Sequence, residues 1–242
     1  MDGLHRDPPV TDSPYVGEMK RRIWAVMREL DLQNAFDYGL PTILQTLEAS
    51  TAAPANLDDS AFDKNSKAIP VPKPPAEYTQ TSYQSIGAQS WDLRLDISRR
   101  LFTANPHLSS PLSTEQVLQF THHITQALDS LPAWTIESGA SNNSEFGLRK
   151  VTLLSWVFLQ LQLKDCLFAI HRPFLHRNSG MYSFSEMICY HAAKEVLLFN
   201  RKLAVLGTQN LTMMRDDLAV ACLILAKVTL ERPKGKLLHR RP

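Results

Sequence analysis

The segment from Val151 to Ile170 is the feature of this sequence that most restricts its fold. Its residues are apolar on almost every face of a helix, so a helix over 148–172 has no polar side for solvent. Glutamines and the Lys164–Asp165 pair interrupt the run, and the uncharged part is shorter than the ~20 residues that span a bilayer. We therefore predict the central helix of a soluble protein and no membrane span.

Apolar residues recur at helical spacing along much of the remaining chain. We expect further helices over 14–36, 80–103, 113–131, 183–206 and 211–230, and a short helix or loop over 42–48. Ser113 with Gln116, and Ser183 with Glu186, have the spacing of capping boxes at helix N-termini. No segment alternates polar and apolar residues as a strand does, so the predicted fold class is all-α, a multi-helix domain.

Prolines divide the chain unevenly, because 12 of the 15 precede residue 140. Four prolines between positions 70 and 75 exclude regular structure there, and we expect disorder over about residues 64–77. We predict four parts along the chain: an N-terminal part of one helical domain (1–62), a disordered Pro-rich loop (63–79), the helical remainder of the same domain (80–230) and a basic tail (231–242).

The first helix is expected to begin at Pro14, with Ser13 as its N-cap. Its apolar residues form one stripe with Trp24 at the flank: Met19, Ile23, Val26, Met27 and Leu30. We expect this stripe to face the core.

The charge balance argues against direct DNA binding. The chain has 26 Lys and Arg against 24 Asp and Glu, a net charge of +2, whereas phosphate binding needs a dense basic surface. The cysteines, Cys166, Cys189 and Cys222, are too far apart for a zinc site or a disulfide framework, so we expect small buried side chains in a reducing compartment. The N-terminus lacks the apolar core of a signal peptide.

An acidic group near Pro54 has the residue types of a magnesium–diphosphate site but not the spacing. It contains Asp58, Asp59 and Asp63, yet Phe62 stands where the third carboxylate is needed, one helical turn after Asp58. We interpret these residues as turn and cap residues.

Two further pairs also fail as sites. His122 and His123 are adjacent and point about 100° apart on a helix, so they cannot bind the same metal ion. Cys166 precedes His171 among apolar residues, where burial keeps a thiol protonated and unreactive. We therefore predict no enzyme and no catalytic, cofactor-binding or metal-binding residue in this chain.

Two basic stretches have simple interpretations. Lys20, Arg21 and Arg22 are expected to form a solvated helix flank. The stretch from Arg232 to Pro242 is interpreted as an unstructured tail, with a nuclear-import signal as the alternative.

The order of several short motifs resembles the fungal-specific transcription factor domain, the middle homology region of zinc binuclear cluster regulators. The resemblance covers about residues 3–206 and rests on the following segments: Gly3–Asp7, Glu18–Trp24, Glu29–Asp31, Gly39–Pro41, Pro54–Asp59 with Phe62, Leu131–Pro132 with Trp134, and Ile170–Leu175.

The resemblance implies an all-helical regulatory region of a nuclear transcription factor, without catalytic residues, that modulates RNA polymerase II transcription. In that family, DNA is read by an N-terminal cluster of six cysteines holding two zinc ions. That cluster is missing here, so neither zinc nor direct DNA contact is expected of this chain. Homodimerisation, transcriptional co-regulators and a small-molecule inducer are the partners that the family suggests.

The family motifs also suggest local roles. Trp24 and Ile23 are expected to dock the first helix on the core, and Arg21 and Arg22 to pair with acids such as Asp58 or Asp59. Arg172 is expected to close the central helix.

The sequence departs from the family pattern at both ends, and we interpret it as a fragment. Two alternatives stay open. One is a helical protein-binding or scaffold module without a role in transcription. The other is an all-α metal-dependent lyase that uses Asp58 and Asp59.

Overall fold

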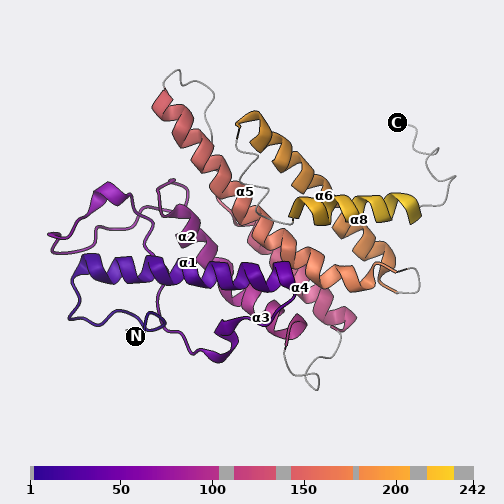
Figure 1. The fold of residues 1–242 in the computed structure, drawn as a ribbon, viewed down its shortest axis with the longest axis horizontal. Coiled ribbons are helices and arrows are strands. Elements are labelled where there is room, and N and C mark those ends of the chain that lie inside the picture. Colours follow the sequence, from indigo (N-terminus) through magenta and orange to yellow (C-terminus); the bar gives the residue numbers. More distant parts are fainter. Residues whose placement is uncertain (1–2, 104–111, 135–142, 177–179, 208–216, 232–242) are drawn as a thin grey trace. The chain divides into compact units, whose positions relative to one another are not determined.

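A computed structural model of the chain describes residues 3–103, 112–134, 143–176, 180–207 and 217–231. These residues form helices and contain no strand, which confirms the all-α prediction (Figure 1). The structure divides into two compact units, residues 1–166 and 167–242, with the boundary inside the long helix α5 (Asn143–His171). The predicted basic tail lies, apart from Glu231, outside the described residues.

The first unit combines longer α-helices with short 3-10 helices. Its elements are α1 (Pro14–Tyr38), η1 (Ile43–Thr46), η2 (Asp59–Ala61), α2 (Ser82–Gly87), η3 (Ala88–Ser90), α3 (Trp91–Leu101), α4 (Thr114–Asp129) and the first part of α5. Helix α1 contacts α2, α3 and η1, and α3 contacts α4.

The predicted N-caps of α1 and α4, Ser13 and Ser113, are confirmed. The Ser13 hydroxyl accepts a hydrogen bond from the backbone N–H of Val16 at 3.3 Å. Gly39 ends α1 with a φ of 66°, a left-handed conformation that favours glycine. At α4, Ser113 and Gln116 form the complete capping box, at 2.9 and 3.2 Å.

Two aromatic-centred clusters form the core of this unit. The first joins α1, η1 and α3 through Trp24, Ala25, Leu32, Leu44, Trp91 and Leu95. The second gathers Ile86, Trp134 and Leu159. Trp24 is only 3% exposed, so its predicted docking role is confirmed.

The expectation that the apolar stripe of α1 faces the core is wrong, because most of its residues point away from the described core. Ile23 is 51% exposed and Leu30 is 56% exposed, and Val26 and Met27 are also exposed. Helix α1 is apolar on two faces, and it buries the one that carries Trp24, Ala25 and Leu32. Ile23 therefore does not dock the helix, contrary to our expectation.

The Pro-rich loop has no helix or strand, as predicted, but part of it is held in place. The Asn56 side-chain amide donates to the backbone carbonyls of Lys73, Pro74 and Glu77, at 3.1–3.2 Å. These bonds satisfy carbonyl groups that the prolines leave outside any helix or sheet. The expectation of disorder is therefore corrected for residues 73–77.

The helix expected over 80–103 is instead divided into α2, η3 and α3. Gly87 ends α2, and the Ser90 hydroxyl donates to the Gly87 carbonyl at 3.0 Å within the tighter 3-10 turn.

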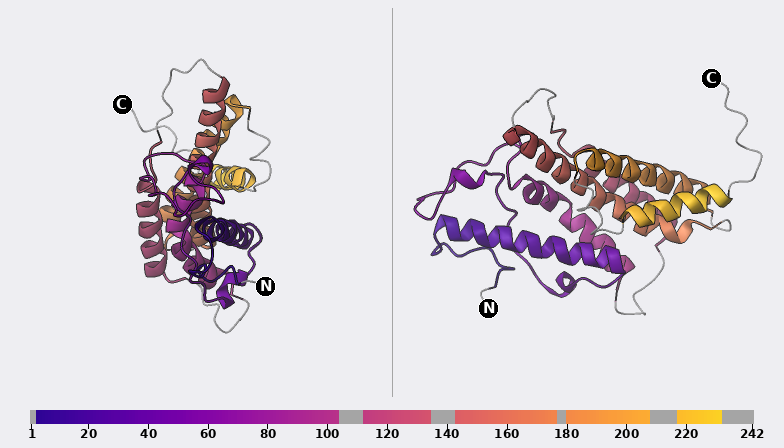
Figure 2. Two further views of the ribbon diagram at one scale, coloured as in Figure 1. Left: turned by 90° about the vertical axis from the view of Figure 1, so that its left-hand side faces the viewer. Right: turned by 45° about the horizontal axis from the view of Figure 1, so that its top comes forward.

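The second unit comprises the end of α5, η4 (Arg172–Phe174), α6 (Tyr182–Val205) and α8 (Asp217–Glu231), and α6 packs against α8 (Figure 2). The expected capping box at Ser183 is wrong, because α6 begins one residue earlier with Met181 at its N-cap. Gly207 follows α6 with a φ of 65°, a left-handed conformation that favours glycine. Residues 208–216, part of the last expected helix, lie outside the described residues.

The apolar segment from Lys150 to Phe174 is long and apolar enough to cross a membrane, judged by length and composition alone. Within the structure, 61% of its most apolar window is buried. A core helix, which is the role that we predicted, passes the same test of length and composition.

Candidate functional site

The acidic group near Pro54 is occupied by ion pairs and turn hydrogen bonds. Asp58 accepts from the Lys73 ammonium at 2.8 Å, and Asp59 accepts from the Arg22 guanidinium at 2.7 Å. The Asn65 backbone N–H, followed by the Ser66 hydroxyl, lowers the pKa of Asp63. Their carboxylates thus have partners within the protein, which speaks against the lyase alternative.

The predicted pairing of the basic run is confirmed for Arg22 and differs for Arg21. Arg21 forms a two-bond pair with Asp7, both distances 2.9 Å, and Lys20 contacts Asp12 at 3.0 Å. The Arg21 guanidinium holds the pKa of the Asp7 carboxyl below its usual range. This run is therefore a set of ion pairs, more than a solvated flank.

These ion pairs bring three of the sequence motifs together. The segment at Asp7, helix α1 at Arg22, and the segment from Pro54 to Phe62 meet in the first unit. Arg22 also contacts Glu18 at 3.2 Å, and its guanidinium lies 5.1 Å from the centre of the Phe62 ring. Motifs that are far apart in the sequence thus contact one another through the arginines of α1.

Asn56 is a hydrogen-bonding centre to which the sequence alone assigned no role. Its amide nitrogen fixes the Pro-rich loop, while its carbonyl oxygen accepts from the hydroxyls of Thr79 and Ser82, both at 2.7 Å. Asn56 and Thr79 are both buried. Only the fold reveals this centre, because its partners lie 17–26 residues away.

A buried ion pair crosses from α1 to α3. The Arg94 guanidinium donates two bonds to the Glu29 carboxylate, at 2.7 and 2.8 Å, and Arg94 is almost fully buried. Burial opposes the positive charge, but the Glu29 carboxylate raises the pKa of Arg94. The pair is neutral as a unit and joins the two helices.

Cys166 and His171 do not have the properties of a nucleophile and its base. Burial raises the pKa of the Cys166 thiol to about 12, and the thiol donates to the Gln162 carbonyl. Burial lowers the pKa of His171 to about 4, and its Nδ1 lies 3.0 Å from the Ser185 hydroxyl. Each residue is part of the core of its own unit.

The expectation of buried cysteines is confirmed for Cys166 and Cys189 and is wrong for Cys222, which is exposed. Burial raises the pKa of the Cys189 thiol to about 12, as it does for Cys166, whereas zinc binds thiolates. Among the described residues, no group of three His, Cys, Asp or Glu side chains could hold a metal ion. His122 and His123 lie exposed on α4.

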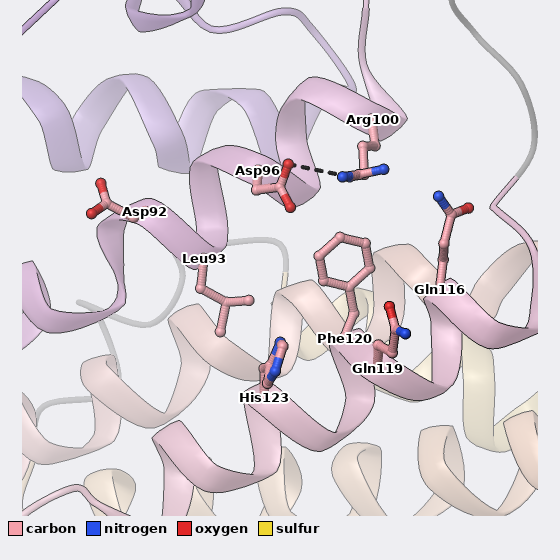
Figure 3. Close-up of a pocket in the computed structure, with 8 residues that line it drawn as sticks. All are labelled: Asp92, Leu93, Asp96, Arg100, Gln116, Gln119, Phe120 and His123. Carbon is pink, nitrogen blue, oxygen red and sulfur yellow. Dashed lines mark hydrogen bonds and ion pairs between the residues drawn. The ribbon is translucent and has the colours of Figure 1, made fainter.

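A surface hollow of about 420 Å³ lies between α3 and α4 (Figure 3). It is lined by Asp92, Leu93, Asp96, Arg100, Gln116, Gln119, Phe120 and His123. Arg100 donates to Asp96 at 3.1 Å, and its guanidinium lies 5.5 Å from the centre of the Phe120 ring. The charges of Arg100 and Asp96 thus neutralise each other, so this hollow offers no concentrated charge to a ligand.

A second hollow of about 180 Å³, which we name the α1–α2 groove, lies within the first unit. It is lined by Ala25, Val26, Glu29, Leu30, Gln33, Tyr83, Gln84, Gly87 and Trp91. Most of these side chains present carbon to the groove, and its rim includes the exposed residues Val26 and Leu30. An apolar hollow with few polar groups is typical of small-molecule sites.

Comparison with known proteins finds curated fungal transcription factors. Transcription factor phm2 of Pyrenochaetopsis sp is 33% identical over 209 residues, which cover 82% of this chain and 26% of that protein. The pyrrolocin cluster transcription factor fsdR of Fungal sp. (strain NRRL 50135) is 29% identical, over 82% of this chain and 25% of its own length. The Zn(2)-C6 fungal-type transcription factor pigI of Monascus ruber is 27% identical, over 81% and 24%.

The chain spans about a quarter of the length of these curated relatives. No protein-family profile matches the chain. No solved structure matches it either. The relatives are named as transcription factors and not as enzymes, which supports the prediction that this chain is not an enzyme.

Proposed function

We propose that this chain, a relative of fungal transcription factors of the zinc-cluster type, is a regulatory region that modulates RNA polymerase II transcription by binding a partner or an inducer. The observation that carries the proposal is the similarity to named transcription factors over about four fifths of the chain. We extend the proposal to a nuclear location, where transcription by RNA polymerase II takes place.

The pattern of charges supports a regulatory role without direct DNA contact. Lys20, Arg21 and Arg22 form the basic run of α1, and each is paired with a carboxylate. A basic side chain that is already paired has little charge left for a phosphate backbone. DNA would then be read by a zinc cluster elsewhere in a longer protein, as the Zn(2)-C6 name of one relative suggests.

The relatives' names also suggest what the factor controls. One is named as the transcription factor of the pyrrolocin cluster and another of the equisetin cluster. We extend this to the present chain and propose that its target genes form a cluster. Homodimers and co-regulators are the macromolecular partners that this role would use.

A reporter assay tests the proposed function. The whole chain is inserted between a heterologous DNA-binding domain and an activation domain in a fungal host, and reporter output is compared with the same fusion lacking the chain. We expect the chain to change the output several-fold. Arg94→Met, which breaks the buried ion pair, serves as the destabilised control and should reduce the change. Equal output with and without the native chain, at equal protein levels, would overturn the proposal.

A further inference from the structure

We propose that the outer face of α1 is the surface through which two copies of this chain associate, with their α1 helices side by side and antiparallel. Homodimers are among the partners of the proposed function, and this inference gives them a surface. It rests on the residues of α1 themselves, so it does not depend on a role in transcription.

Five apolar side chains lie exposed along one face of α1. Their exposed fractions are 41–56%, and they are Val16, Ile23, Val26, Met27 and Leu30. Single exposed apolar residues are common on soluble proteins, but a continuous apolar stripe is typical of an interaction surface. This stripe extends over about 21 Å of the helix.

The spacing within the stripe indicates that its partner is another α-helix. Steps of three and four residues alternate along one seam of α1: Val16, Met19, Ile23, Val26 and Leu30. This is the a and d spacing of a coiled coil, which keeps one seam of a helix against a neighbouring helix. Met19 is half-buried, and the other four residues are exposed.

The seam matches a second copy of itself in the antiparallel direction. When Ile23 lies opposite Val26 of the second copy, the same register places Met19 opposite Leu30 of that copy. Two-fold symmetry repeats both contacts, so four apolar layers follow one another along the pair of helices. A face that matches itself in this way makes a second copy the expected occupant.

The charges beside the seam permit this contact. Lys20 and Arg22 flank it, and each is already paired with a carboxylate of its own chain, Asp12 and Asp59 respectively. A charge that has a partner does not lose its hydration uncompensated when the second copy approaches. In a parallel pair the two basic runs would lie at the same level, whereas an antiparallel pair separates them and opposes the helix dipoles.

The contact between the two helices is small, but α1 is preorganised for it. Helix α1 is held in place by its buried inner face, so association does not have to fold it. We expect a dimer with a Kd on the order of 10 μM. Well below this concentration the chain is a monomer, and the stripe then contributes little to its stability.

Sedimentation velocity of the purified full chain over about 1–200 μM tests the inference. We expect a monomer–dimer equilibrium in this range. Ile23→Asp places a charge in the central layers, opposite Val26 of the second copy, and should raise the Kd about 30-fold or more. Leu118→Asp, at a position of α4 that is 45% exposed, is the matched control and should leave the Kd unchanged. Circular dichroism confirms that both variants are folded.

Disulfide cross-linking tests the direction of the helices. Chains with Met19→Cys and chains with Leu30→Cys carry different mass tags and are mixed and oxidised, in a Cys222→Ser background that removes the exposed native thiol. The antiparallel register predicts that the disulfide between positions 19 and 30 predominates. Disulfides that join position 19 to position 19 would instead indicate a parallel pair and contradict the inference.

A native chain that stays monomeric up to about 200 μM would overturn the inference and leave the stripe to a different occupant. Dimerisation that Ile23→Asp weakens no more than Leu118→Asp does would overturn it as well.

Failure of the two proposals is distinguishable. A dimer of the native chain without any effect of the chain on the reporter would support the interface and contradict the transcriptional role. A reporter effect of a chain that sediments only as a monomer would do the reverse.

Discussion

Helix α1 carries large apolar side chains on two faces, and the described residues cover only one of them. The inner face buries Trp24 and Leu32 together with Glu29, whose charge is paired with Arg94. The outer face exposes Ile23 and Leu30. A charged residue such as Glu29 can thus be buried when it has a partner, and a large apolar residue such as Leu30 can remain exposed. The inner face stabilises the fold, whereas the described residues leave the outer face exposed.

Substitutions of the neighbours Trp24 and Ile23, one on each face of α1, should differ most in their effect on the free energy of unfolding. Trp24→Ala removes a buried indole and should lower the free energy of unfolding by about 3–5 kcal/mol. Ile23→Ala removes exposed atoms and should change it by less than about 0.5 kcal/mol. Urea denaturation of both variants measures the difference. Similar losses in the two variants would mean that the outer face is also covered.

The second prediction concerns the buried ion pair of the inner face. Arg94→Met leaves the Glu29 carboxylate buried without a partner, and the loss should be about 3–5 kcal/mol. The double variant Glu29→Met with Arg94→Met removes both charges and should recover much of this loss. Denaturation of the single and double variants forms a double-mutant cycle. A double variant as unstable as Arg94→Met would contradict the pairing energetics that we describe.

Outside α1, the hydrogen bonds of the buried Asn56 side chain should also contribute to stability. Asn56→Ala removes the amide that joins the Pro-rich loop to Thr79 and Ser82, and should destabilise the chain by about 2 kcal/mol. Asn65→Ala, at an exposed position in the same loop, is the control and should have little effect. Limited proteolysis should also cut the Asn56→Ala loop faster. Equal proteolysis of the two variants would show that Asn56 does not hold the loop.

The smallest expected effect is a pH dependence of stability, which arises from the buried His171 of the second unit. Burial lowers the pKa of His171 to about 4, below its ordinary value of 6.5, so the unfolded chain binds more protons between these values. Stability should therefore fall as the pH falls through this window, by about 1 kcal/mol between pH 7 and pH 5.5. Thermal unfolding at the two pH values should show a smaller decrease in His171→Gln, but an unchanged one in the exposed control His122→Gln. An unchanged decrease in His171→Gln would remove His171 as the cause.

The sequence predicted those parts of the fold that depend on local chemistry. Ser13 and the Ser113–Gln116 box begin helices through contacts a few residues away, and the structure confirms them. Ser183 has the same local spacing but lies inside α6, because the helix starts one residue earlier.

The remaining features depend on contacts between distant segments. Helical spacing identified an apolar stripe on α1 but not which stripe is buried, since that depends on α3. Glu29 and Arg94 are 65 residues apart, and either one alone is typical of an exposed side chain. The α1–α2 groove likewise needs residues from three helices, so no single motif could indicate it.

Genome-wide transcript measurement is the most direct test of a role in transcription. In the organism that carries this gene, transcripts are measured after its deletion and after restoring the native gene or its Arg94→Met variant. We predict that a group of clustered genes changes on deletion and recovers with the native gene but not with the variant. Unchanged transcripts after deletion, under conditions in which the native protein is present, would contradict the account.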